Sequence, residues 1–409
     1  MQTILLTAAL LVTAARLGLT LLNMRQLSRP LPALPSALAA VVEPSTWQQA
    51  ARYARERARF GLVSMLFTRM LGLWALFGGA VAAYDAWVSA LFPSFVASGV
   101  AFYLGLAALV FTLTTPFSLY FTFVIEARYG FNRSSFGLWC ADLLKGGVLS
   151  AALLAGGAAL GLSLVELAPS LYWLLAWALA AALSVLLSIA WPHLIEPLFF
   201  KVTSLSDPAL EPSIRELAER ARVQVTRVFQ VDASRRSSHS NAYFSGLGPE
   251  KRVVLFDTLL ARLNHPEILA VLAHELGHYR KNHVLKRFVT SQLLSLAVCY
   301  AAFFGLEHGD VSSWVGASHG SFAFRVLVLA FAFSLAEFVA TPLFSYWSRR
   351  DEREADAFAR ELTGDPGALA SGLAKLARDN LSNLNPHPLH AAFYGSHPPT
   401  RERIMALSS

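Results

Sequence analysis

Residues 274–278 read His-Glu-Leu-Gly-His, residue types at a spacing that can bind a metal ion and use it for hydrolysis. Positions i and i+4 of a helix lie one turn apart on the same face, so the imidazoles of His274 and His278 can reach one ion. Glu275 lies between them and can take a proton from a water molecule at the metal. Such a pattern arises by chance in about one chain in a hundred of this length. The pattern alone is therefore a hypothesis, and its alternative is a surface helix with two solvated histidines.

The residues before this motif predict the helix that would carry it. Asn264 can cap the N-terminus of the helix, and Glu267 follows three residues later, at the spacing of a capping box. Pro266 suits the first helical turn. The apolar residues that would pack the helix then follow: Ile268, Leu269, Val271, Leu272 and Leu276.

A catalytic zinc site needs a third protein ligand and one position left for water. A carboxylate is typical when a glutamate is the base, and acidic residues follow the last apolar run of the chain, at Asp351, Glu352 and Glu354. Residue type and spacing do not choose among these three. Asp356, one turn beyond Glu352, could accept a hydrogen bond from the free ring N–H of a ligand histidine.

The composition indicates a membrane protein. The chain has 409 residues, of which 55% are hydrophobic and 15% are charged, whereas a soluble domain carries about 25% charged residues. Basic residues near membrane ends explain the net charge of +7. The sequence has no stripe of basic residues interleaved with aromatic residues, so it gives no sign of nucleic-acid binding. The expected surroundings are therefore membrane lipid, without a nucleic-acid partner.

Apolar runs of about 18 residues or more are long enough to span a membrane as helices. The sequence contains seven such runs, and the first is expected to remain as an uncleaved span because no basic start precedes it. These runs lie near 3–22, 62–91, 98–125, 146–165, 170–192, 288–306 and 326–347.

The connections between these runs predict an orientation and four segments. Connections rich in Arg and Lys alternate with neutral or acidic ones, which places the N-terminus outside and the C-terminus in the cytoplasm. Spans one to five with their loops occupy 1–200, and spans six and seven occupy 288–348. The cytoplasmic segments are 201–287, which holds the metal-binding helix, and 349–409, which completes the metal site.

The two cytoplasmic segments also carry local patterns. An amphipathic helix is expected over Ser213–Arg222. Strand-like runs follow at Arg227–Val231, Asn241–Phe244 and Arg252–Phe256. The C-terminal segment is expected to be helical until Pro386 and loop-like from there through Pro399.

Several expected spans carry polar or charged residues, which seldom face lipid and normally line a cavity or pair with one another. Together they favour a solvated interior, with structural pairing as the alternative for each residue alone. These residues are Arg69, Asp85, His193, Glu196 and Glu337.

Taken together, the motifs resemble the type I CAAX prenyl protease family of membrane zinc endopeptidases, over about 122–407. The resemblance rests on several separate segments in one order. These are Phe123-Val124-Ile125-Glu126 with Tyr129-Gly130-Phe131-Asn132, Arg236 to Phe244, Val254 to Leu259, His274 to His278, the block from Ser348 to Asp356, and Ser396-His397-Pro398-Pro399.

The resemblance implies an all-α polytopic membrane protein whose seven helices enclose a large chamber. A cytoplasmic zincin-like metalloprotease domain with a small β element would complete the fold. It implies one Zn²⁺ per chain, held by His274, His278 and Glu352. The expected substrate is a peptide or protein of the CAAX type, prenylated or not. The Ala-, Leu- and Arg-rich composition suggests a bacterium, and hence the inner membrane.

The resemblance also implies roles for four further residues. Asn241 would lie on a strand that pairs with the substrate backbone, and His397 would approach the scissile carbonyl. Arg350 and Arg403 would hold the site together or contact the end of the substrate. Three rival interpretations stay open: a quality-control protease of membrane proteins, an intramembrane protease, and a non-enzymatic chamber with a structural metal.

Overall fold

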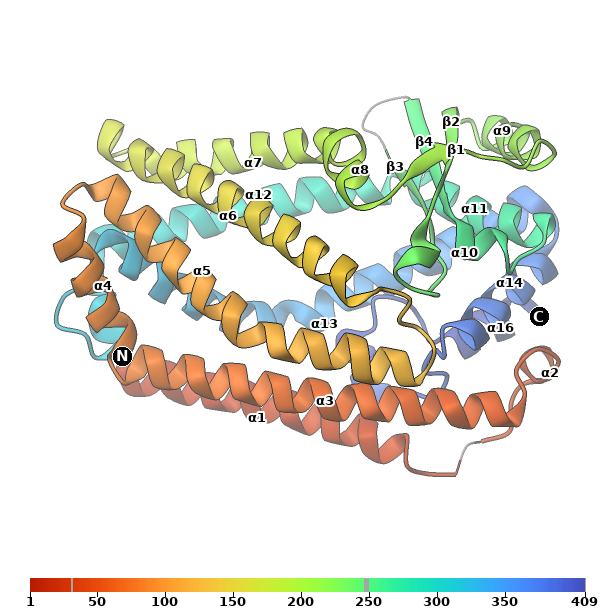
Figure 1. Cartoon of the computed structure of the whole chain (residues 1–409), viewed down its shortest axis with the longest axis horizontal. Helices are drawn as coiled ribbons and strands as arrows, with labels where there is room; N and C mark the ends of the chain where they lie inside the picture. Colours follow the sequence, from red (N-terminus) through yellow and green to blue (C-terminus); the bar gives the residue numbers. More distant parts are fainter. Residues whose placement is uncertain (31, 246–249, 409) are drawn as a thin grey trace.

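Seven helices long and apolar enough to cross a membrane dominate the computed structural model, which describes residues 1–30, 32–245 and 250–408 (Figure 1). At most 22% of the most apolar window of any of these helices is buried within the chain. Their apolar side chains therefore face lipid rather than a protein core. The helices are α1 (Gln2–Gln26), α3 (Pro44–Phe77), α5 (Phe95–Tyr120), α6 (Phe136–Leu167), α7 (Tyr172–Ala190), α12 (His283–His308) and α13 (Phe322–Thr363).

The predicted number of spans is confirmed, but several bounds were wrong, including the start of the fourth span, which is Phe136 rather than near residue 146. The second span begins at Pro44 rather than near residue 62, and it ends at Phe77. Gly78 and Gly79 then turn the chain, with Gly79 at a φ of 83° that favours glycine. The short helix α4 (Ala80–Leu91) follows as a separate element.

Two spans end in π-helical turns. The segment η1 (Phe121–Glu126) continues α5, and η2 (Trp191–Ile195) with α8 (Glu196–Phe199) continues α7. Pro192 in η2 lacks an N–H and cannot donate a hydrogen bond within the helix. The remaining short helices are α2 (Ser36–Ala39), η3 (Ala233–Arg235), α10 (Asp257–Leu260) and η4 (Ser312–Val315).

The charged residues inside the spans divide into two groups. Asp85 accepts hydrogen bonds from Ser321 N at 2.8 Å and Ser321 Oγ at 2.5 Å, which ties α4 to the start of α13. Glu196 accepts a hydrogen bond from Tyr243. These two carboxylates therefore have structural partners. Arg69 and Glu337 make no ion pair with any residue that the structure describes, which agrees with a solvated interior.

A four-stranded sheet and most of the shorter helices gather at the end of the molecule opposite the N-terminus (Figure 1). The strand order is β1-β2-β4-β3, with β1 (Val202–Ser204), β2 (Gln224–Val231), β3 (Ala242–Ser245) and β4 (Glu250–Phe256). Strands β2 and β4 are parallel, and β3 is an edge strand antiparallel to β4. Three of these strands were predicted, to within a few residues at their starts.

Helices α9 (Leu210–Arg220), α11 (His265–Arg280) and α14 (Pro366–Asp379) share a buried core with the sheet. The predicted loop from Pro386 through Pro399 was wrong in part, because α15 (Pro388–Tyr394) forms there; α16 (Thr400–Ser408) follows the predicted loop. Helix α13 runs for 42 residues, with Pro342 inside it. The expected boundary between residues 348 and 349 therefore lies inside one helix that joins the last span to the soluble part.

Candidate metal centre and active site

Helix α11 carries the two histidines, and it begins as the sequence predicts. The Asn264 side chain accepts a hydrogen bond from Glu267 N at 3.0 Å, and the Glu267 carboxylate accepts one from Asn264 N at 2.9 Å. This capping box fixes the start of the helix. His274 and His278 then lie one turn apart, with their Nε2 atoms separated by 3.3 Å. Two ring nitrogens at this separation can share one cation.

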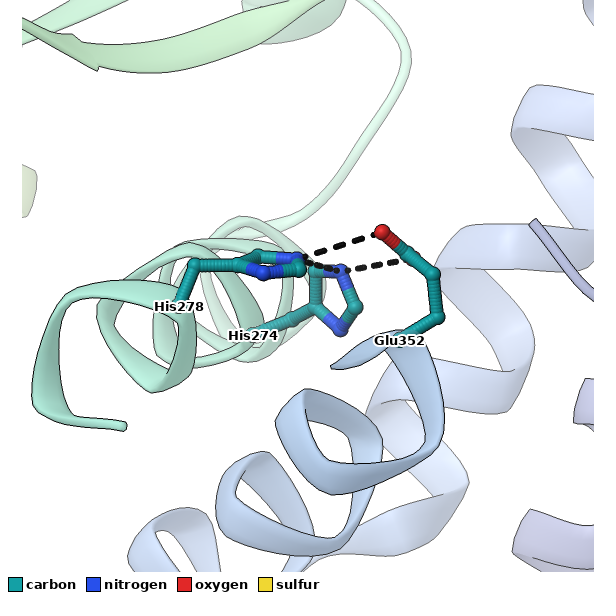
Figure 2. Close-up of side chains that lie close together, drawn as sticks. All are labelled: His274, His278 and Glu352. Atoms are coloured by element: carbon teal, nitrogen blue, oxygen red, sulfur yellow. Dashed lines mark hydrogen bonds and ion pairs between the residues drawn. The ribbon is translucent and has the colours of Figure 1, made fainter. Parts of the chain in front are cut away.

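The Glu352 side chain reaches this histidine pair from α13, which packs against α11 (Figure 2). Gly277 lies at the contact, where an added Cβ would come within 3.0 Å of the Ala355 Cα. A glycine at this position therefore lets the two helix backbones approach closely. The Glu352 Oε1 lies 3.3 Å from His278 Nε2, and its Oε2 lies 3.3 Å from His274 Nε2.

The three side chains fit a metal ion. One donor atom from each of His274, His278 and Glu352 lies within 4.8 Å of the others. The Glu352 Oε2 is buried and has no hydrogen-bond partner, which is costly unless something else satisfies this oxygen. Two imidazoles and one carboxylate are the donor set of hydrolytic zinc sites that keep a fourth position open. Of the three acids left open by the sequence, Glu352 is the one beside both histidines.

Asp356 and Arg403 support His274 from behind. The Asp356 Oδ1 lies 2.8 Å from His274 Nδ1, and Arg403 donates two hydrogen bonds to the Asp356 carboxylate, at 2.6 and 2.8 Å. Burial lowers the pKa of His274, but the hydrogen bonds to Asp356 and Glu352 outweigh burial and raise it to about 9. A metal ion must therefore displace a proton from this ring. The Arg403 guanidinium lies 3.6 Å from Glu352 Oε2, and the Arg403 side chain is only 9% exposed.

His283 is a site residue that the sequence patterns did not single out. Its Nδ1 lies 3.1 Å from His278 Nδ1, and its Nε2 lies 3.2 Å from Glu354. When His278 Nε2 binds a metal, its Nδ1–H can donate to His283, whose Nε2–H can donate to Glu354. His283 is 1% exposed, so this chain of hydrogen bonds fixes the orientation of the His278 ring. The signal in the sequence is a histidine five residues after His278.

Replacing His283 with alanine is expected to weaken zinc binding about 10- to 100-fold, because the His278 ring loses the partner of its second nitrogen. The measurement is zinc retention during titration with a chelator. His265→Ala is the matched control, since His265 is a surface histidine paired with Asp207 at 2.7 Å. Equal zinc affinity in both variants would contradict the role of His283.

A buried ion pair anchors α11 to α14. Lys375 Nζ lies 2.6 Å from Glu267 Oε1, and Ser371 Oγ donates to the same carboxylate at 2.6 Å. Burial would raise the pKa of Glu267, but these partners and the Asn264 N–H hold it below its ordinary value of 4.5. The ion pair fixes the helix that carries the histidine pair against the soluble core.

Lys375→Met is expected to lower the free energy of unfolding of the soluble part by about 2 kcal/mol, because the Glu267 carboxylate stays buried without its cation. The loss is complete above the ordinary pKa of 4.5 and disappears as pH falls through the lowered pKa, where the carboxylate becomes neutral. Thermal unfolding in detergent at several pH values measures it. Lys281→Met, at an exposed position, should unfold like the wild type at every pH.

Glu275 and His397 both lie near Glu352 and the two histidines of α11. Burial raises the pKa of Glu275 above its ordinary value of 4.5, and the two neighbouring histidines oppose this shift. The His397 Nε2 lies 3.3 Å from Glu352 Oε1, and 59% of the His397 side chain is exposed. Partial desolvation and the positive charge of Arg403 lower the pKa of His397, and the charge of Glu352 opposes this shift. A base on one side and an exposed imidazole on the other can flank a substrate carbonyl.

The other two predicted substrate contacts lie farther out. Asn241 is exposed directly before the edge strand β3, and its backbone carbonyl accepts a hydrogen bond from Phe256 N at 3.1 Å. Arg350 pairs with Glu354 at 3.1 Å and is 68% exposed. Among the described contacts, Arg350 reaches the metal ligands only through Glu354 and His283.

The membrane-spanning helices and the His-Glu-Leu-Gly-His site together define a metallopeptidase embedded in a membrane. Residues 204–409 match Peptidase family M48, and residues 23–201 match the CAAX prenyl protease N-terminal region, described as five membrane helices. The chain belongs to peptidase family M48. It is an integral multi-pass membrane protein whose substrate is a peptide or protein, as the sequence predicts.

Relatives cover nearly the whole chain. CAAX prenyl protease 1 homolog of Arabidopsis thaliana is 34% identical over 402 residues, which are 95% of this chain and 93% of the relative. CAAX prenyl protease 1 of Saccharomyces cerevisiae is 33% identical, over 91% of this chain and 88% of the relative. The crystal structure of S. mikatae Ste24p is similar with a TM-score of 0.88 at 29% identity, covering 99% of this chain and 98% of that one.

Proposed function

We propose that the chain binds one zinc ion through His274, His278 and Glu352 and hydrolyses peptide bonds near the C-terminus of CAAX-type proteins. The convergence of these three donors beside Glu275 carries the proposal. Similarity to CAAX prenyl proteases over more than nine-tenths of the chain supports the substrate class.

A zinc ion at this place would supply Lewis acidity and make a water molecule a better nucleophile near neutral pH. Glu275 takes the proton of the attacking water and later delivers it to the leaving amine. His397 donates a hydrogen bond to the carbonyl oxygen as negative charge develops there. Asp356 and Arg403 keep His274 oriented, and His283 does the same for His278.

The edge strand β3 is suited to hold the substrate extended. Strand β3 pairs with β4 on one side, so its other side can add a peptide strand through backbone hydrogen bonds. Asn241 stands at the N-terminal end of this edge and would contact the substrate backbone, and Arg350 would contact the substrate end from outside the site. Recognition through backbone hydrogen bonds depends little on the side chains of the substrate.

The sidedness belongs to the same proposal. The N-terminus lies at the end of the bundle opposite the metal site (Figure 1). With basic connections on the side of the metal site, the N-terminus would face outward and the active site the cytoplasm. In a bacterium this membrane would be the inner one, with lipid around the spans and prenylated tails accepted without being required.

The test uses a farnesylated CAAX peptide and its unfarnesylated counterpart, with purified protein of known zinc content. We expect cleavage of the farnesylated peptide by the wild type and none by Glu275→Gln. Equal cleavage of both peptides would agree with prenylated tails being accepted without being required and would keep the protease. Bound zinc without cleavage of either peptide would contradict the proposed substrate class, and damaged membrane proteins would be the next substrate to test.

A further inference from the structure

A polar cavity lies between α1, α3 and the segment 380–394, and none of the metal ligands lines it. Its volume is about 690 Å³, and Arg16, Arg57, His239 and His390 contribute to its lining. No carboxylate is among the described residues that line it. The cavity is therefore cationic, although it lies among membrane-spanning helices.

Neither Arg16 nor Arg57 makes a direct ion pair within the described part of the chain, although the Glu126 carboxylate interacts with the charge of Arg57. The Arg16 guanidinium lies 4.8 Å from the centre of the Phe338 ring, and its Nε is buried without a hydrogen-bond partner. Arg57 lies over the Tyr53 ring at 5.2 Å. Arg16 is half-buried and Arg57 is exposed, so both guanidinium charges can reach an anion in the cavity.

The nearby carboxylate of Glu126 is already occupied. It accepts a hydrogen bond from Tyr53 at 2.5 Å, and its second oxygen lies 3.3 Å from His239 Nε2. His239 stacks on Phe131 with ring centres 4.1 Å apart, which fixes its position. No direct ion pair joins Glu126 to Arg57 within the described part of the chain, so both guanidinium groups can still donate hydrogen bonds to an anion that enters the cavity.

The cavity borders the segment that completes the active site. His390 and Tyr394 of α15 line it, and His397 follows Tyr394 by three residues. Ser345 fixes α15 to α13 by donating to Phe393 O at 2.8 Å. Ser345 and Glu352 are seven residues apart on α13, which corresponds to about 10 Å along the helix.

The direction of the edge strand β3 also points to the cavity. A peptide antiparallel to β3 has its C-terminal end beside Asn241, where β3 begins. His239, two residues earlier, lines the cavity. Three extended residues span about 10 Å, so a chain that ends three residues beyond the cleaved bond can reach this cavity.

We propose that the cavity binds the C-terminal carboxylate of the peptide substrate through Arg16 and Arg57. Leu62, Met65 and Leu381 also line the cavity and would contact the aliphatic side chains next to that carboxylate. The inference rests on the proposed peptidase function. It defines the substrate class further, as peptides with a free C-terminus a few residues beyond the cleaved bond.

The test compares two farnesylated CAAX peptides that differ only in a C-terminal acid or amide. For the wild type we expect a KM at least about tenfold lower for the acid, as for the gain of a charged hydrogen bond. Arg16→Gln and Arg57→Gln should raise the KM for the acid about tenfold and leave kcat, zinc content and amide cleavage unchanged. Arg59→Gln is the control, since Arg59 belongs to α3, is exposed and also lacks an ion pair among the described residues but does not line the cavity.

Binding to the inactive Glu275→Gln protein, followed by fluorescence anisotropy, separates this inference from the proposed function. Tighter binding of the acid supports the cavity even if the wild type cleaves neither peptide. Equal KM and equal binding of acid and amide would overturn the inference while leaving the peptidase intact. If phosphatidylglycerol instead binds in preference to phosphatidylcholine, and only while both arginines are present, the anion is a lipid phosphate and the proposal is wrong.

Discussion

Glu275→Gln will reduce peptide hydrolysis by about a thousandfold or more while the protein keeps its metal. The amide cannot accept a proton from the attacking water, and positioned acid–base groups contribute about 10²- to 10⁴-fold to catalysis. Glu275 lies on α11 between the histidines and makes no hydrogen bond to them. The measurement is kcat for a CAAX peptide together with zinc content in the same preparation.

A matched glutamate separates this effect from a general loss of charge. Glu361 is exposed on the C-terminal part of α13, so Glu361→Gln should keep the wild-type rate. A Glu275→Gln protein with more than a tenth of the wild-type activity would exclude Glu275 as the base. Loss of zinc from this variant would instead place Glu275 among the groups that hold the metal.

Glu352→Gln will remove the metal, and with it all hydrolysis. The carboxylate contributes one of three protein donors and supplies the negative charge between two imidazoles. Each protein ligand contributes to the free energy of zinc binding. Loss of one of the three is therefore expected to lower zinc affinity at least about a hundredfold. Competition with a chromophoric chelator measures the affinity, and activity in excess zinc measures whether the site can still be filled.

The neighbouring acids provide the control that the sequence itself suggests. Asp351→Asn and Glu354→Gln change carboxylates that lie beside His283, at 3.7 and 3.2 Å, rather than between the two ligand histidines. Each should therefore weaken zinc binding much less than Glu352→Gln does. A similar loss in all three variants would mean that the net negative charge, and not a particular ligand, holds the metal.

The elements with local signals were predictable from the sequence. The capping box at Asn264 and the apolar runs depend on residues close together in the chain, so pattern and spacing suffice for them. The choice of Glu352 over Asp351 and Glu354 depends on how α13 crosses α11. Gly277 permits that crossing by its missing side chain, which no local pattern reveals. Only the resemblance to a family pointed to Glu352 beforehand.

Elements that depend on tertiary contacts were missed for the same reason. His283 begins α12, directly after Asn282 takes a left-handed conformation, and it contacts His278 only because of this turn. Helix α15 has only seven residues, and contacts with α13 hold it in place: Arg349 donates hydrogen bonds to the carbonyls of Ala391, Ala392 and Gly395. Seven residues are too few to form a stable helix alone.

Because α13 joins the last span to the active site, the thickness of the bilayer can change the geometry of the active site. One helix of 42 residues, about 63 Å long, holds both the last span and Glu352, and Pro342 interrupts its hydrogen bonding ten residues before Glu352. A span that is too long for its bilayer adapts by tilting or bending. A bend of about 10° at Pro342 would move Glu352 by about 2.6 Å at the end of a 15 Å arm. Lipids with longer or shorter acyl chains would then tune how well the carboxylate meets the two imidazoles.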